Sequence, residues 1–207
     1  MAFKTAFAKA CFIIVAGAYS TAHAAPNYTP APKKVRLVVF NGALSPAEAS
    51  EVANRASAAW YPFAQVARID FRTWRNLPTA GPDIFSRADQ LYKAAAWART
   101  KGMHRGHGSV AMVLPELDGG YLAGLALTTC ASSPARSYAT VNTKPFRVES
   151  NTIATVHEVG HLLGASHITA PLSWMHPDAL GEGQRQGYQS VARFAPQSTA
   201  QIKNCRR

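Results

Sequence analysis

The sequence predicts an α/β (α+β) domain in which helices pack on a mixed, twisted sheet. In the first hundred residues, short runs of β-branched residues alternate with alanine-rich segments of helical spacing. That order is typical of helices packed against a sheet. Several short apolar runs then follow one another before the next helical segment. No internal repeat or linker interrupts the pattern, which favours a single domain.

The first two elements have clear boundaries. A β-branched run over residues 34–40 (KVRLVVF) stops at the turn residues Asn41 and Gly42, so it reads as a strand. Ser45 and Glu48 then form a capping-box pattern with a proline at the first helical position. The helix that follows is expected to run to about Tyr61, before a proline.

The later elements follow the same logic of apolar spacing and turn residues. A second strand is expected over residues 65–74 and a second helix over residues 86–100. Three further strands are predicted at 109–114, 121–129 and 137–142, and a last helix at 153–163.

The N-terminus has the pattern of a secretory signal peptide. Lys4 and Lys9 precede an apolar stretch over residues 10–18, and Ala22 and Ala24 are small residues at a cleavage site. Cleavage is expected after Ala24, so the product would be secreted or periplasmic. No other stretch approaches the roughly 20 apolar residues of a membrane span.

Residues 25–207 are then long enough for one domain with a sizeable core. Without the two lysines of the signal, 20 Lys and Arg face 11 Asp and Glu. Weak binding to anionic surfaces is compatible with this charge, but no basic block with interleaved aromatics indicates a specific nucleic-acid partner. We expect a monomer with a soluble, basic surface.

One segment carries the chemistry: residues 157–167 read HEVGHLLGASH. His157 and His161 are four residues apart, so on a helix they point toward a common ion. Gly164 can adopt a left-handed conformation and end the helix. The chain can then return His167 as a third ligand. The alternative is a buried helix that merely carries histidines, but this pattern fixes five positions.

Three imidazole ligands leave the fourth tetrahedral position of a zinc ion to water, the arrangement of a catalytic site with one Zn²⁺. Zinc lowers the pKa of such a water towards about 7. Glu158 follows the first ligand directly, so its carboxylate can serve as general base and return the proton to the leaving amine.

The extended motif resembles that of the metzincin zinc metallopeptidases. These enzymes carry a methionine turn beneath the zinc, and Trp174-Met175-His176-Pro177 lies at the expected distance from His167. The resemblance implies a metzincin-like fold with an irregular C-terminal subdomain. It also implies that Met175 underlies the metal and that Pro177 belongs to one wall of the substrate pocket.

The segment GGYLAGLA at 119–126 is similar to the glycine-rich turn and edge strand with which matrixins bind an extended substrate by main-chain hydrogen bonds. An ordinary sheet strand is the alternative. The substrate-binding residues implied by this resemblance are Leu122, Ala123, Gly124, Leu125 and Ala126.

Two cysteines, Cys130 and Cys205, follow the signal sequence. An oxidising compartment favours a disulfide between them, with two unpaired thiols as the alternative. Reprolysins bridge a similar cysteine to the C-terminal part of the domain. The reprolysin and matrixin patterns differ from this sequence at Ile168, Trp174 and His176, so no subfamily is assigned.

The sequence therefore predicts a secreted zinc-dependent endopeptidase that acts on polypeptides. A secreted zinc-containing binding protein without proteolytic activity is the main alternative, although the intact Glu158 disfavours it. A basic protein whose partner is an anionic polymer is a third possibility, and it is compatible with proteolysis.

Overall fold

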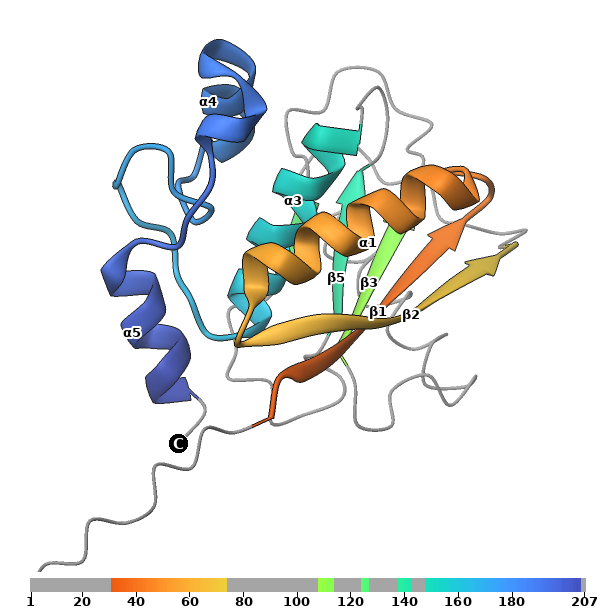
Figure 1. Cartoon of the computed structure of the whole chain (residues 1–207), viewed down its shortest axis with the longest axis horizontal. Helices are drawn as coiled ribbons and strands as arrows, with labels where there is room; N and C mark the ends of the chain where they lie inside the picture. The colour runs from red at the N-terminus through yellow and green to blue at the C-terminus, as the bar shows by residue number, and fades with distance from the viewer. Residues whose placement is uncertain (1–30, 74–107, 114–123, 127–137, 143–147, 206–207) are drawn as a thin grey trace, which may run out of the picture.

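The computed structural model describes residues 31–73, 108–113, 124–126, 138–142 and 148–205 (Figure 1). The predicted signal peptide at 1–24 and the predicted helix at 86–100 lie outside the described residues. None of the described helices is long and apolar enough to cross a membrane.

A five-stranded mixed sheet forms the centre of the fold, with strand order β2-β1-β3-β5-β4. β4 runs antiparallel to β5, and the other neighbouring strands are parallel. β4 is thus an edge strand in the described sheet. The strands span Lys33–Phe40 (β1), Ala64–Arg72 (β2), Gly108–Val113 (β3), Gly124–Ala126 (β4) and Tyr138–Asn142 (β5).

Helix α1, Pro46–Trp60, connects the parallel strands β1 and β2. The predicted capping box is present: the Glu48 backbone N–H donates to Ser45 Oγ at 3.3 Å, and the Ser45 backbone N–H donates to Glu48 Oε2 at 2.9 Å. These bonds satisfy two of the backbone N–H groups that a helix start leaves without partners. β2 ends at Arg72, two residues before the predicted end.

Helix α3, Val148–Leu162, is buried along most of its length between the sheet and the other helices. It begins five residues before the predicted start. The added turn contains Ser150, Asn151 and Thr152, which are all buried and which apolar periodicity cannot detect.

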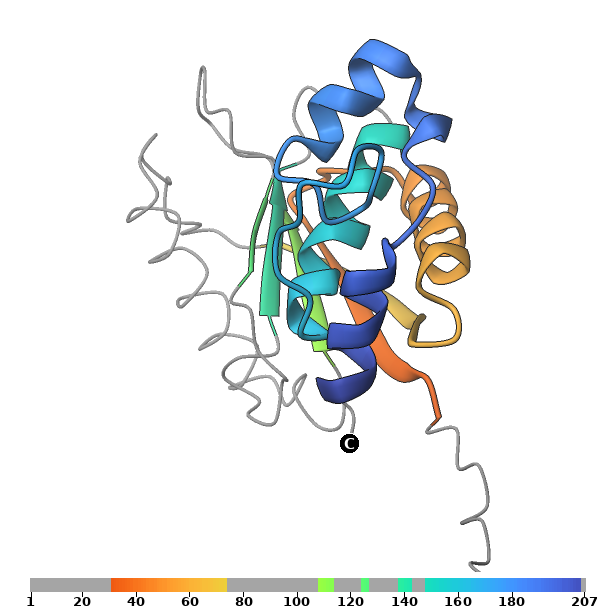
Figure 2. The same ribbon diagram turned by 90° about the vertical axis from the view of Figure 1, so that its left-hand side faces the viewer.

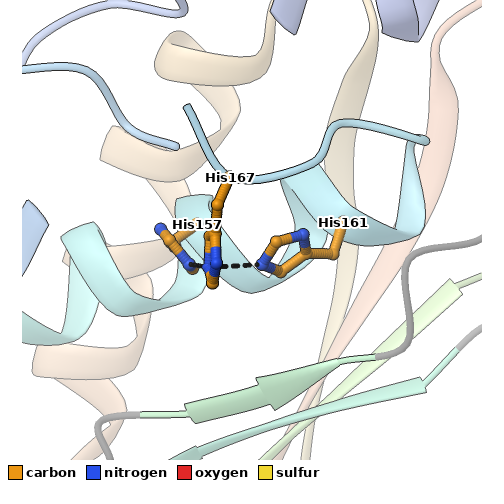
Figure 3. Close-up of side chains that lie close together, drawn as sticks. All are labelled: His157, His161 and His167. Carbon is orange, nitrogen blue, oxygen red and sulfur yellow. Dashed lines mark hydrogen bonds between the residues drawn. The ribbon is translucent and has the colours of Figure 1, made fainter. Parts of the chain in front are cut away.

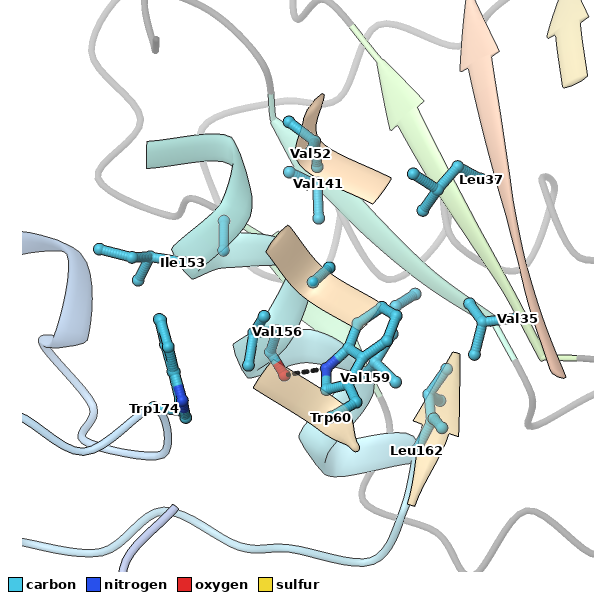
Figure 4. Packing of buried hydrophobic residues seen from close by; sticks show 14 of the residues in the cluster. Val35, Leu37, Val52, Trp60, Val141, Ile153, Val156, Val159, Leu162 and Trp174 are labelled. Carbon is cyan, nitrogen blue, oxygen red and sulfur yellow. Dashed lines mark hydrogen bonds between the residues drawn. The ribbon is translucent and has the colours of Figure 1, made fainter. Parts of the chain in front are cut away.

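The core lies between the sheet and the two helices α1 and α3 (Figure 4). Val35 and Leu37 of β1 pack toward Trp60 of α1 and the apolar residues of α3. The Trp60 indole N–H donates to the Val156 carbonyl at 3.4 Å, so the polar end of this fully buried side chain has a partner. This packing fixes α3 relative to the sheet.

The C-terminal part begins with residues 163–178, which contain no helix or strand, and then forms three short helices. These helices are Ala179–Gln186 (α4), Tyr188–Ser190 (η2) and Pro196–Cys205 (α5). The sequence did not predict their boundaries. Seen from the side, α1, α3 and α5 lie on the same face of the sheet (Figure 2).

Candidate metal centre

Two of the three predicted ligands lie on successive turns of α3. His161 is buried, with 7% of its surface exposed, and His157 is half-buried. Because α3 is held by the core, the spacing between these two rings is set by a rigid helix.

The end of α3 forms a Schellman motif. The Ala165 N–H donates to the Gly160 carbonyl at 3.0 Å, and the Gly164 N–H donates to the His161 carbonyl at 2.9 Å. Gly164 has a φ of 100°, the left-handed conformation that the sequence predicts. The glycine thus turns the chain back toward the helix that it has just left.

His167 is carried by the loop that follows, and two sets of hydrogen bonds hold that loop. The Ile168 N–H donates to the Met175 carbonyl at 3.1 Å. On the other side of His167, the Ser166 N–H donates to Gln201 Oε1 at 3.0 Å, and Gln201 Nε2 donates to Ser166 Oγ at 2.7 Å. The third ligand is therefore fixed by α5 and by the turn at Met175.

The three imidazole rings converge (Figure 3). The Nε2 atom of His167 lies 3.0 Å from Nε2 of His157 and 3.2 Å from Nε2 of His161. The Nδ1–H of His157 donates to the Trp174 carbonyl at 2.6 Å, and that of His161 donates to the Ala165 carbonyl at 2.8 Å. Since a carbonyl only accepts, each of these Nδ1 atoms carries the proton and each Nε2 presents a lone pair.

This donor set fits a zinc ion. Two Nε2 lone pairs face the Nε2 of His167, which can carry at most one proton, so one hydrogen bond cannot satisfy both. Zn–N bonds of about 2.0–2.1 Å at tetrahedral angles separate ligand nitrogens by about 3.3 Å, close to both distances found. The carbonyl partners of Nδ1 are the outer interactions that orient metal-binding histidines.

The protonation of the rings also suits a metal. Burial, followed by the neighbouring His161, lowers the pKa of His157 to about 3. Burial likewise lowers the pKa of His161 and of His167. Neutral imidazole is the form that binds a metal, so all three rings are ready to bind at neutral pH.

Glu158 follows His157 on α3 and is not one of the three converging groups. Its side chain is buried, with 6% of the residue exposed, and it packs against Gly124 at the start of β4. Burial raises the pKa of this carboxyl group to about 8. A carboxyl group with a pKa near neutrality, next to a metal ligand, has the properties of a general acid or base.

Met175 lies under the zinc-binding helix. It is fully buried, and its sulfur contacts Gly160 so closely that any side chain at position 160 would overlap it. The Trp174 N–H donates to the Arg193 carbonyl at 2.9 Å, and the Trp174 carbonyl holds His157. The turn therefore contacts the helix, the first ligand and the loop of the third ligand.

Glu182 of α4 also holds the loop between His167 and Met175. Its Oε2 accepts a hydrogen bond from the Leu172 N–H at 2.7 Å and lies 3.6 Å from Nδ1 of His176. Leu172 has a positive φ of 55°, which a branched side chain rarely adopts. The buried carboxylate thus stabilises an unusual backbone conformation between His167 and Met175.

Comparison with known proteins identifies the family. The sequence profile of metallopeptidase family M12B, reprolysin-like, matches residues 51–168, more than half of the chain. This chain belongs to that family. The match confirms the metzincin-like resemblance and supports a metalloendopeptidase, and the subfamily stays unassigned. No curated protein matches the chain.

Solved structures share the fold of this reprolysin-like chain. A zinc-dependent peptidase from Methanocorpusculum labreanum is 18% identical, with a TM-score of 0.59, over 81% of this chain and 99% of that one. Metalloproteinase-II from Bacteroides fragilis is 14% identical, with a TM-score of 0.58, over 87% of this chain. This chain spans only 55% of the Bacteroides protein. At these identities the similarity shows the fold.

The structure places some of the predicted substrate residues and not others. Gly124 and Ala126 are half-buried on β4, and Leu125 pairs through its backbone with Thr140. Pro177 is exposed at the end of the methionine turn. Leu122, Ala123 and Cys130 lie outside the described residues, so the predicted disulfide with Cys205 stays a prediction.

Several supporting residues were missed from the sequence. Trp174 and Ala165 orient the ligand rings through backbone carbonyls, and a carbonyl leaves no residue-type signal. Gln201 is 35 residues away from Ser166, and Glu182 belongs to a different element from Leu172. A glutamine on a short polar helix has no pattern that indicates such a contact.

Proposed function

We propose that this chain is an exported zinc-dependent endopeptidase that hydrolyses peptide bonds in polypeptides, with Glu158 as general base. The observation that carries the proposal is the convergence of three imidazoles with oriented Nε2 atoms, beside a buried carboxyl group. The family assignment supports the same class of reaction. A structural zinc site is closed by four protein ligands and has no open position at which a carboxylate could act.

His157, His161 and His167 would hold the ion. A bound zinc supplies Lewis-acid chemistry, which polarises the peptide carbonyl and makes a coordinated water more acidic. Glu158, in its ionised form, accepts a proton from the attacking water as the new carbon–oxygen bond forms. It then donates this proton to the leaving nitrogen as the carbon–nitrogen bond breaks, which gives a carboxylic acid and an amine.

The substrate would lie along β4. This strand is paired on one edge with β5 and is the last strand of the described sheet. An extended peptide can add to such an edge through main-chain hydrogen bonds. Because Gly124 packs against Glu158, a peptide held along this strand passes close to the base. Pro177, at the methionine turn, would border the pocket for the residue after the scissile bond.

Export and a disulfide complete the proposal. Removal of residues 1–24 would release the domain into the periplasm or the medium, where Cys130 and Cys205 would pair. Cys205 ends α5, and Gln201 on the same helix holds the loop of His167. N-terminal sequencing of the exported protein, with a thiol titration, tests both parts. A mature start near Ala25 without free thiols is expected, and an intact N-terminus or two titratable thiols would contradict them.

A peptide-pool assay tests the proteolytic function. The purified protein is mixed with a diverse peptide pool with and without a chelator, and cleavage sites are mapped by mass spectrometry. Chelator-sensitive internal cleavage is expected. Glu158→Gln should keep zinc and lose roughly 10²- to 10⁴-fold in rate, the typical contribution of a general base.

Two outcomes would overturn the assignment in different ways. Stoichiometric zinc with no cleavage of any peptide would favour the zinc-containing binding protein. Full activity of the Glu158→Gln variant would remove the general-base role and leave the peptidase class intact. Cleavage that is insensitive to the removal of zinc would contradict the zinc mechanism.

A further inference from the structure

Gly124 occupies a position where a side chain has no room. A Cβ atom built on it would lie 2.6 Å from Cγ, 2.8 Å from Cδ and 2.7 Å from Oε1 of Glu158. Carbon atoms that are not bonded to each other pack at about 3.5–4.0 Å, so all three contacts are overlaps. The Glu158 side chain therefore fills the volume that a residue other than glycine would need.

The backbone does not explain this glycine. Among the described glycines, Gly42, Gly164 and Gly187 have a positive φ, and Gly124 does not. Residues with side chains adopt its backbone conformation without strain. Gly124 also pairs regularly with Val141 in the antiparallel ladder. Glycine weakens a strand and often marks a place of close approach, which fits the contact between Gly124 and Glu158.

Glu158 has little freedom to move aside. Its backbone belongs to α3, which the core and the contact between Gly160 and Met175 hold in place. Only 6% of the residue is exposed, so the carboxyl group is enclosed by protein and not by water. A shift of the side chain away from β4 would change its distance from the three imidazoles, which lie on the same helix and its following loop.

We propose that Gly124 is a positioning residue for Glu158: by lacking a side chain, it lets the carboxyl group rest directly against β4. The conformer of Glu158 is then set by the strand. This inference rests on the proposed function, since it concerns the residue assigned as the general base. It adds that the strand expected to bind the peptide also sets the position of the base.

The role predicts a change in kcat and not in KM for Gly124→Ala. The added methyl group leaves the main-chain edge of β4 in place, so KM should stay within about threefold of the wild-type value. Displacement of a catalytic group by about 1 Å can cost on the order of 100-fold in rate. We expect kcat to fall at least about tenfold while zinc content stays at the wild-type level.

A double-mutant cycle on thermal stability gives a readout that does not depend on activity. It compares the wild type, Gly124→Ala, Glu158→Ala and the double variant, each treated with a chelator. Gly124→Ala should lower Tm in the wild-type background and leave Tm nearly unchanged in the Glu158→Ala background, where the overlap is gone. Residues in contact show such non-additivity, whereas independent sites do not.

Three results would overturn the positioning role: an equal fall in Tm in both backgrounds, a kcat within about twofold of the wild type, or a rise in KM alone. If Gly124→Ala does not fold, the double variant should still fold, and failure of both would also refute it. These outcomes are separate from failure of the proposed function, which full activity of Glu158→Gln would show.

Discussion

The two halves of the metal centre are built in different ways. His157 and His161 lie on a buried helix, and their spacing is local in the sequence. His167 is exposed on a loop without regular structure, and α5 and the methionine turn hold that loop. The first half depends on the core, and the second depends on a few hydrogen bonds between distant segments.

The two halves therefore contribute differently to metal binding. The helix half is preorganised, because α3 would keep its position whether or not a metal is bound. The loop half closes the site, and its position follows from the Schellman turn, the Ser166–Gln201 pair and the bond from Ile168 to Met175. Changes in the loop half should therefore affect metal binding more than folding.

The largest effect is expected from replacing a ligand in either half. His161→Ala and His167→Ala should each weaken zinc binding by roughly 10²- to 10³-fold, since a binding free energy on the order of 10–16 kcal/mol is shared among few ligands. Only His161→Ala should also destabilise the metal-free protein, by about 1–3 kcal/mol, because it leaves the Ala165 carbonyl without its partner.

Zinc titration together with urea unfolding in a chelator distinguishes the two halves. Equal destabilisation of both metal-free variants would contradict the distinction.

The protonation of Glu158 tests how far water is excluded from the helix that carries His157 and His161. Burial raises its pKa from 4.5 to about 8 in the folded protein. The stability gained from its protonated form is therefore full below pH 4.5 and is lost as the pH rises to about 8. The side chain of Glu158→Gln stays neutral at every pH. The metal-free variant should therefore become more stable relative to the metal-free wild type as the pH increases.

One pKa unit corresponds to about 1.4 kcal/mol, so the gain between pH 5 and pH 8 should reach roughly 2 kcal/mol or more. Urea unfolding of both chelated proteins at these two pH values measures it. A difference in stability that is the same at pH 5 and pH 8 would mean that the carboxyl group is well solvated.

The turn that joins the halves should be sensitive to Gly164→Ala. The left-handed conformation costs a residue with a side chain about 1–2 kcal/mol, and relief of this strain would move His167. We expect a loss of this size in unfolding free energy and a zinc affinity lower by roughly tenfold.

Gly42→Ala is a matched control. Gly42 also has a positive φ, of 72°, but it lies in the exposed turn after β1, with space for a methyl group. It should show a similar loss of stability and an unchanged zinc affinity. Weaker zinc binding in both variants would mean that the effect of Gly164 is not local.

The smallest effect is expected at the contact between α5 and the loop. Gln201→Ala removes both hydrogen bonds to Ser166. Loss of a group that orients a ligand costs about 10- to 100-fold in metal affinity at most sites, and the lower end is expected because Ile168 still anchors the loop. Competition with a zinc-binding dye measures the affinity.

Lys203→Ala, on the exposed side of the same helix, is the control and should bind zinc as tightly as the wild type. If Gln201→Ala also binds zinc like the wild type, α5 has no part in positioning the third ligand.

The same contrast explains what the sequence could predict. The helix half was predictable because the four-residue spacing of His157 and His161 is a property of any α-helix. Gly164 was predictable because few residues can end a helix in the left-handed conformation. The order of the described strands with α1 and α3, and the capping box at Ser45, followed from equally local patterns.

Other features depend on contacts that no local pattern encodes. The early start of α3 escaped prediction because its first turn is buried but polar. The support that Gln201 and Glu182 give to the loop links segments that are far apart in sequence or lie on different elements. The need for glycine at position 124 comes from a side chain on another element, Glu158, and appears only when β4 and α3 are packed together.

Zinc K-edge absorption spectroscopy of the zinc-loaded protein is the most direct measurement of how the two halves combine. Three imidazole nitrogens and one oxygen at about 2.0–2.1 Å are expected for the wild type, with one nitrogen fewer in His167→Ala. A wild-type spectrum with only two imidazoles, or with a sulfur ligand at about 2.3 Å, would contradict a catalytic centre formed by His157, His161 and His167.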